Sequence, residues 1–155
     1  MNEDIFDILI YLFENYMNSE VETTPNSDEL KSELKQAGFT NSCINKAFDW
    51  LDSLALQEES EFKSPKNFRI FCAEEIQKLD LECRDFLLFL ERLSILTPNN
   101  RELVIDRAMA IEESLISIEE IKWISLIVLL SQPGDEIAIA HMENIIYQEA
   151  SALLN

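Results

Sequence analysis

Large apolar residues recur along this chain at intervals of three and four positions, the spacing that places side chains on one face of an α-helix. The pattern first appears at residues 5–17, where the polar residues Asp7, Glu14 and Asn15 fall close to a helical period. It predicts an amphipathic N-terminal helix with a wide apolar face. Such a face implies docking against the rest of the chain or against a second copy.

Two further helices are predicted at residues 27–37 and 41–54, with a tight turn between them. Gly38 stands where a glycine commonly follows a helix C-terminus. Thr40 stands where a hydroxyl side chain caps the next helix. The two helices and their short connection predict a helix-turn-helix.

A polar stretch at residues 58–67 separates this helix-turn-helix from four residues, 68–71, that are rich in aromatic and branched side chains. Residues of that kind favour an extended segment. A helix is expected to begin near Cys72 or Ala73. The order of helix, turn, helix, polar stretch, short strand and helix is that of a winged helix-turn-helix.

The second half of the chain is predicted to be helical throughout, with helices at residues 83–96, 98–111, 118–130 and 136–154. Thr97 and Pro98 supply an N-cap and a proline at the first helical position. Ser117 and Glu120 have the spacing of a capping box. These signals predict where two of the four helices begin.

The predicted fold class is therefore mostly α: an N-terminal helix, a small winged helix-turn-helix-like lobe with a short β element, and a C-terminal helical bundle. The chain has only two glycines and four prolines, which is typical of long helices with short connections. We expect residues 1–80 to form the helix and the winged lobe, and residues 81–155 to form the bundle, with one shared core.

The net charge of the chain limits the kinds of partner that it can bind. Twelve basic and 30 acidic side chains give a net charge of −18. Such a surface repels nucleic acid and anionic membranes, and it suits a basic protein partner. The start of the chain lacks the basic residues of a secretory signal, and the apolar run at 121–130 is too short to span a bilayer. We therefore expect a cytoplasmic protein that does not bind membranes, with a homodimer still allowed.

A helix-turn-helix often binds DNA, and here the charges argue against that role. Residues 28–71 carry a net charge of −2, against −16 for the rest of the chain. This region is the least acidic part of the chain, yet it is no basic patch, and several phosphate contacts are normally needed for binding. The candidate contacts, to nucleic acid or to a protein partner, are Asn41, Asn45, Lys46, Lys63, Lys66 and Arg69.

No residue pattern predicts a catalytic site, a metal site or a cofactor. Cys43, Cys72 and Cys83 are widely spaced, and they indicate reduced thiols rather than a zinc site. His141 is the one histidine. Adjacent glutamates on a helix diverge and share no site, so an enzymatic carboxylate pair would have to be assembled in space. Arg84 is expected to play a structural part by pairing with Asp80 or Glu82.

Segments spread over nearly the whole chain resemble the Smg family of proteobacterial proteins. They are 6–14, 37–39, 47–51, 69–71, Glu74-Glu75, 83–91 and Lys122-Trp123. The resemblance implies no particular biochemical activity, although Smg-like proteins tend to be encoded beside a DNA-processing protein and topoisomerase I. Where the family has Tyr-Thr-Pro, this chain has Phe71-Cys72-Ala73. Separately, residues 28–80 are similar in topology to a MerR-like winged helix.

Three hypotheses follow. The leading one is a non-enzymatic cytoplasmic adaptor that binds another protein through an acidic surface or through the winged lobe. The alternative is a nucleic-acid-associated regulator that uses the winged helix-turn-helix. The third is an enzyme with a carboxylate site assembled in space.

Overall fold

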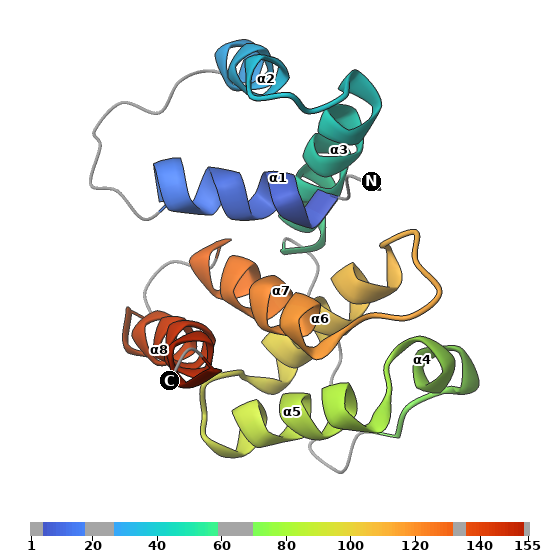
Figure 1. The fold of residues 1–155 in the computed structure, drawn as a ribbon. Helices are drawn as coiled ribbons and strands as arrows, with labels where there is room; N and C mark the ends of the chain where they lie inside the picture. Colours follow the sequence, from blue (N-terminus) through green and yellow to red (C-terminus); the bar gives the residue numbers. More distant parts are fainter. Residues whose placement is uncertain (1–4, 18–26, 59–69, 132–135, 154–155) are drawn as a thin grey trace. The chain divides into compact units, whose positions relative to one another are not determined.

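A computed structural model describes residues 5–17, 27–58, 70–131 and 136–153, and these residues are almost entirely helical (Figure 1). The elements are α1 (Ile5–Leu12), the π-helix η1 (Phe13–Met17), α2 (Ser27–Gln36), α3 (Asn41–Glu58), α4 (Ala73–Lys78), α5 (Leu81–Arg92), α6 (Pro98–Met109), α7 (Ile118–Ser131) and α8 (Glu136–Leu153). The mostly helical fold class predicted from the sequence is confirmed.

The chain divides by its internal contacts into two compact units, Met1–Ser53 and Leu54–Asn155. In this grouping α4 belongs with the second unit, whereas the sequence analysis placed it in the first lobe. A division into folding domains at residue 80 stays a prediction.

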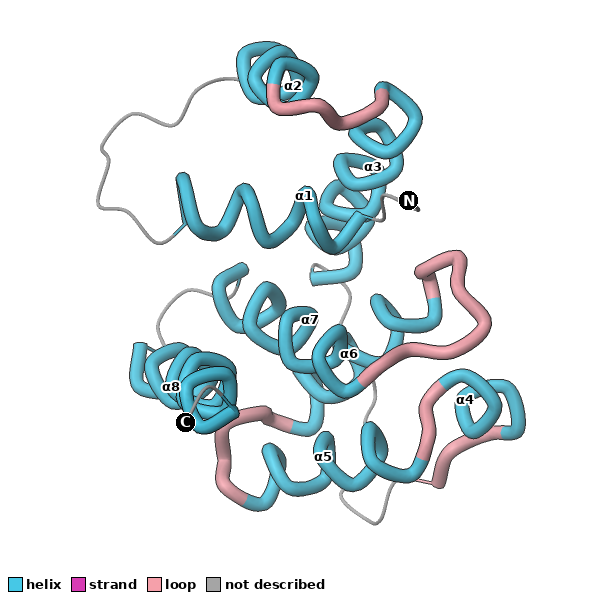
Figure 2. Tube along the Cα trace, in the orientation of Figure 1, coloured by secondary structure: helices cyan, strands magenta, loops and turns pink. Residues whose placement is uncertain are grey.

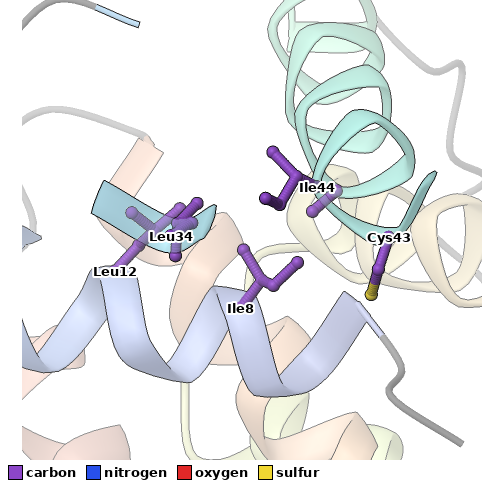
Figure 3. Close-up of a cluster of buried hydrophobic side chains, with 6 residues drawn as sticks. Ile8, Leu12, Leu34, Cys43 and Ile44 are labelled. Carbon is purple, nitrogen blue, oxygen red and sulfur yellow. The ribbon is translucent and has the colours of Figure 1, made fainter. Parts of the chain in front are cut away.

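The first unit contains a cluster of buried apolar side chains contributed by three helices (Figure 3). Ile8 and Leu12 come from α1 and Leu34 comes from α2. Cys43 and Ile44 come from the first turn of α3. Burial of each of the larger side chains contributes about 1.5–3 kcal/mol. This burial explains why the mostly polar helix α2 packs against the mostly apolar helix α1.

The turn between α2 and α3 follows the sequence prediction closely. Gly38 has a φ of +109°, a backbone conformation that favours glycine. The backbone N–H of Phe39 donates to the carbonyl of Leu34 at 3.1 Å, which ends α2. The hydroxyl of Thr40 accepts a hydrogen bond from the N–H of Cys43 at 3.2 Å, so Thr40 caps α3 as expected.

The last part of the N-terminal helix is a π-helix, which the sequence analysis did not predict. In it the amide of Asn15 donates to the backbone carbonyl of Tyr11 at 2.8 Å. The hydroxyls of Tyr11 and Tyr16 both donate to the carboxylate of Glu33 on α2. The wider turn of the π-helix therefore occurs where two tyrosine hydroxyls share the carboxylate of Glu33, and these hydrogen bonds connect the segment to α2.

In the second unit, α7 is the central helix. It packs against α5, α6 and α8, and eight consecutive or near-consecutive residues from Ile121 to Leu129 are buried. A helix that is apolar around most of its circumference is expected to be enclosed by other helices. The helix predicted at residues 118–130 is confirmed, and the apolar run within it is buried.

Capping side chains fix the helix starts of the second unit. The hydroxyl of Thr97 accepts from the N–H of Asn100 at 3.1 Å, with Pro98 at the first helical position. Ser117 and Glu120 form the reciprocal capping box, with bonds of 3.0 and 3.2 Å. Both predicted starts are confirmed.

The bounds of α5 differ from the predicted 83–96. The helix begins earlier because the carboxylate of Asp80 accepts from the N–H of Cys83 at 2.9 Å and so caps Leu81 onward. It ends earlier because Ser94 adopts a positive φ of 60°. The N–H of Ile95 then donates to the carbonyl of Leu90, which closes the end of the helix.

The expected β element is not observed among the described residues, which Figure 2 colours as helix or loop only. Ile70 and Phe71 form no strand, and the other two residues of the expected strand, 68 and 69, lie outside the described part of the chain. One isolated parallel bridge joins Leu79 to Ile116. It connects the end of α4 to the segment before α7.

Candidate functional site

The predicted contact residues that the structure describes lie on α3. Asn41, Asn45 and Lys46 are all exposed there. The opposite side of the helix buries Cys43, Ile44 and Ala47 in the apolar cluster. The expected helix-turn-helix therefore presents these three polar residues away from its own core.

The same exposed side of α3 also carries acidic residues. Asn41, Asn45 and Asp49 follow one another at four-residue spacing, so they share one helix face, and Asp52 is exposed one turn farther on. A negative charge beside Lys46 weakens attraction to phosphate. Lys63, Lys66 and Arg69, the expected wing contacts, lie outside the described residues.

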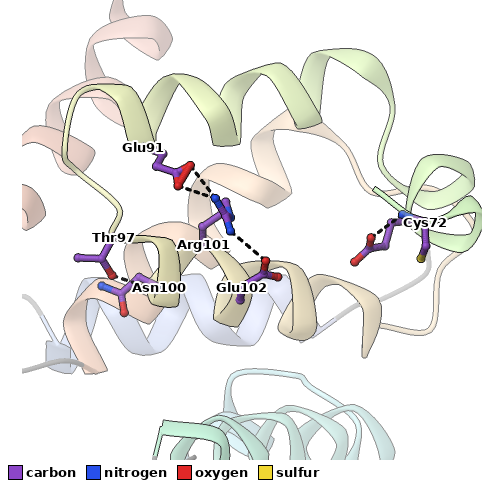
Figure 4. A network of polar contacts seen from close by, with 7 residues as sticks. Cys72, Glu91, Thr97, Asn100, Arg101 and Glu102 are labelled. Carbon is purple, nitrogen blue, oxygen red and sulfur yellow. Dashed lines mark hydrogen bonds and ion pairs between the residues drawn. The ribbon is translucent and has the colours of Figure 1, made fainter. Parts of the chain in front are cut away.

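The second unit buries a guanidinium group between two of its helices (Figure 4). Arg101 on α6 is 2% exposed. Its Nη1 donates to both carboxylate oxygens of Glu91 on α5, at 2.8 Å to Oε2, and its Nη2 donates to Glu102 at 3.0 Å. Two carboxylates therefore hold one buried cation, and this ion pair fixes α5 against α6.

Two other basic side chains of the second unit are buried as well. Arg107 donates to the carboxylate of Asp106 at 2.8 Å. Lys122 lies 3.6 Å from the carboxylate of Glu119, and its Nζ is 5.8 Å from the ring centroid of Phe86. These cations are used inside the unit rather than on its surface.

Lys78 and Arg84 bond to the backbone. The ammonium group of Lys78 donates to the carbonyls of Met109, at 2.9 Å, and Ile111, both at the C-terminal end of α6. Burial lowers the pKa of Lys78, and the negative charge of Glu113 opposes that shift. Nε of Arg84 donates to the carbonyl of Leu79 at 3.0 Å and weakly to that of Asp80. Its structural role is as expected, with backbone carbonyls in place of the expected carboxylates.

The consequence is a strongly acidic exterior on the second unit. Its exposed charged residues, within the described ranges, are one base, Arg92, and seven acids. The acids are Glu74, Asp80, Glu82, Asp85, Glu112, Glu119 and Glu136. The net charge follows from the sequence alone, whereas the internal bonding of these cations is seen only in the structure.

Helix α5, together with its C-cap residue Leu93, also exposes apolar side chains. Leu81 is 63% exposed, Phe89 is 42% exposed and Leu93 is 52% exposed. The three lie at positions separated by multiples of four, with Asp85 between them, and so they follow one side of the helix. We call Leu81, Asp85, Phe89 and Leu93 the α5 stripe. Its signal in the sequence is a second apolar face beside the core positions Cys83, Leu87 and Leu90.

The three cysteines are free thiols. Cys43 and Cys83 are buried, and Cys72 is exposed. Cys83 donates its S–H to the carbonyl of Ile116 at 3.4 Å, and burial, followed by the acidic neighbour Asp80, raises its pKa to about 12. Cys72 occupies the N-cap position of α4, and its N–H donates to the carboxylate of Glu75 at 2.9 Å (Figure 4).

The described residues bring together no group of three His, Cys, Asp or Glu side chains fit to hold a metal ion. His141 is exposed on α8. Of the helices described, none combines the length and the apolar character needed to cross a bilayer.

Comparison with known proteins gives one consistent result. The family model described as "Protein of unknown function (DUF494)" matches residues 5–155. A protein of Methylococcus capsulatus named Protein Smg homolog is 53% identical over 148 residues, which cover 96% of each chain. A Protein Smg homolog of Nitrosococcus oceani is 49% identical over the full length of both chains.

A third relative with the same name, from Shewanella loihica, is 46% identical and covers 97% of this chain and 99% of its own. No solved structure matches the chain. The matched ranges of these relatives extend over both units of the chain. The chain therefore belongs to the Smg family, DUF494, as its sequence segments indicated.

Proposed function

We propose that this chain is a non-enzymatic cytoplasmic adaptor that binds a basic protein through its acidic surface. The observation that carries the proposal is the inward placement of the cations in the second unit. Five of its six described basic residues bond internally, whereas seven acids are exposed. A surface of one sign attracts a partner of the other sign.

The physical consequence is a salt-dependent association. Complementary charges raise the rate of encounter, and dissolved salt screens them beyond about 8–10 Å. Binding should therefore weaken steeply between low and moderate ionic strength. The free thiols Cys43, Cys72 and Cys83 support a reducing compartment.

The test is a pull-down from native cytoplasm with the tagged full chain, at low and at moderate salt, with and without nuclease. We expect a stoichiometric basic protein that withstands nuclease and is released by salt. Recovery of nucleic acid alone, or of proteins that are lost on nuclease treatment, contradicts the adaptor. Substrate turnover by the purified chain at an enzyme-like rate contradicts its non-enzymatic character.

The second candidate is a nucleic-acid-associated regulator that uses a winged helix-turn-helix. It is favoured by the exposure of Asn41, Asn45 and Lys46 on α3, next to the tight turn after α2. Asparagine and lysine side chains are suited to base and phosphate contacts, respectively. In this proposal Lys63, Lys66 and Arg69 form the wing.

Charge reversal distinguishes the second candidate from the first. The double substitution Lys46→Glu with Lys63→Glu should abolish binding to duplex DNA and remove about two units of its salt dependence. The matched control is Lys35→Glu, since Lys35 is exposed on α2. Unchanged affinity and slope in the double variant contradict a nucleic-acid role for this face.

A further inference from the structure

Resting on the adaptor function above, we propose that the α5 stripe is the docking site for an amphipathic helix of another protein, one that carries basic side chains beside its apolar face. The stripe consists of Leu81, Asp85, Phe89 and Leu93, and all four are exposed. Exposed apolar residues arranged along one helix face mark an interaction surface more often than scattered ones do.

The length of the stripe fits a short helix. Leu81 and Leu93 lie 12 residues apart, which corresponds to about 18 Å along the helix axis. A partner helix of about three turns spans that distance. Apolar anchors at three- and four-residue spacing on the partner would meet Leu81, Phe89 and Leu93 in register.

The opposite side of α5 packs into the core of the second unit, which holds the helix in place. On its inner side α5 buries Cys83, Leu87 and Leu90. The rings of Phe86 and Phe89 lie 6.4 Å apart between centroids, and the ammonium of Lys122 lies over Phe86. The buried residues of α5 hold the backbone that carries Phe89, so little backbone entropy is lost when a partner binds there.

The charges around the stripe select the partner. Asp85 lies within it, and Glu82 and Asp80 are exposed at its N-terminal end. Arg84, the cation nearest to these acids in sequence, donates to backbone carbonyls. The carboxylates of Glu82 and Asp85 are exposed within about one turn, where lysine or arginine side chains of a partner would pair with them, whereas the carboxylate of Asp80 caps the helix.

The same charges disfavour the other occupants. A second copy would bring its own Glu82 and Asp85 to the interface, on a chain of net charge −18, so the two copies repel each other. An anionic membrane surface is repelled for the same reason. A basic helix of a different protein is the occupant that satisfies both the apolar and the acidic groups.

The experiment uses the full chain and the protein captured in the pull-down described above. Phe89→Glu should weaken its binding at least tenfold, since a central aromatic anchor is lost. Asp85→Lys should also weaken binding and should reduce its salt dependence. The control is Ile137→Glu, because Ile137 is an exposed apolar residue on another helix, α8, and is 72% exposed against 42% for Phe89. This substitution should leave binding unchanged.

A photo-crosslinking residue at position 89 identifies the occupant directly. We expect it to join a segment of the partner that has an apolar face and basic side chains. Crosslinks to a second copy, or partner binding that is unchanged by both α5 substitutions, overturn the docking site and leave the adaptor function standing. If no protein is captured by the unaltered chain, the adaptor function itself has failed. Circular dichroism and urea unfolding of each variant show that a loss of binding is not a loss of folding.

Discussion

The two units of this protein use their charged side chains in opposite ways. The first unit is held by an apolar cluster and by two tyrosines on one glutamate, and Lys35 and Lys46 lie on its surface. The second unit turns most of its described cations inward, onto carboxylates and backbone carbonyls. The comparison teaches that the net charge of a chain does not give the charge of its surface. An internal ion pair withdraws a cation and a carboxylate together, whereas Lys78 and Arg84 bond to uncharged backbone carbonyls, so their charges are not available on the surface to balance the exposed acids.

The largest expected effect tests whether the inward cations of the second unit stabilise it. Arg101→Ala leaves Glu91 and Glu102 without their shared guanidinium, and it should lower the free energy of unfolding by about 3–5 kcal/mol. Urea unfolding measures the loss, and hydrogen exchange read peptide by peptide should locate it in α5 and α6. The control is Arg92→Ala, because Arg92 is exposed and follows Glu91 directly in α5. It should change the free energy of unfolding by less than about 0.5 kcal/mol. Equal effects of the two substitutions would show that the buried ion pair contributes little.

A smaller effect is expected from the lysine that bonds to the end of α6. Lys78→Met keeps much of the side-chain volume and removes the donors to the carbonyls of Met109 and Ile111. Hydrogen bonds from a charged group contribute about 1.5–3 kcal/mol, and the variant should lose about that amount in urea unfolding. Lys35→Met serves as the matched control in the first unit, where the lysine is exposed. A loss as large in the control would contradict the distinction between the two units.

In both units a helix ends at a residue with a positive φ, which is Gly38 in the first unit and Ser94 in the second. Gly38 ends α2 with a φ of +109°, and an added Cβ would meet open space there. Gly38→Ala should therefore cost only the backbone strain, about 1–2 kcal/mol. Ser94 after α5 has a φ of 60°, and Ser94→Gly should be neutral or stabilise by up to about 1 kcal/mol. Thermal unfolding of both variants checks the pair, and a destabilising Ser94→Gly would point to contacts of the serine side chain.

The last expected effect belongs to the Cys83 thiol, and it changes with pH only above pH 9. Its pKa is raised from 9.0 to about 12 in the folded protein, so the folded state holds the thiol proton more tightly than the unfolded state does. This contribution to stability is complete below pH 9, and it declines as the pH rises from 9 towards 12. Urea midpoints measured from pH 7 to pH 11 should fall above pH 9 in the natural chain. The fall should be reduced in Cys83→Ala, and identical pH profiles would contradict the assignment.

Much of the fold could be predicted from local signals. Helical spacing located each of the main helices, and the caps at Thr40, Thr97 and Ser117 marked their starts because capping depends on neighbouring residues alone. The start of α5 at Leu81 was missed, since Asp80 was considered as a partner for Arg84 rather than as a cap. The π-helix at 13–17 was missed because its turn is accompanied by contacts of Tyr11 and Tyr16 to Glu33, which lies 22 and 17 residues away in the sequence.

The candidate site divides in the same way. Exposure of Asn41, Asn45 and Lys46 followed from helical periodicity, because the opposite positions on α3 are apolar. The α5 stripe could not be predicted, since Phe89 and Leu93 look like core residues in a helix that is apolar on two sides. Which of two apolar faces is buried depends on the helices that pack against it.

The sequence by itself determined the helical class, the family, the turn at Gly38 and the net charge of −18. These properties depend on composition and on residues a few positions apart. Only the tertiary structure decided that Arg101 and Lys78 are held inside, and that one apolar face of α5 is left exposed. The reason is that a charge is neutralised, and an apolar face is covered, by whatever lies nearest in space. In a chain of 155 residues that neighbour often comes from another helix.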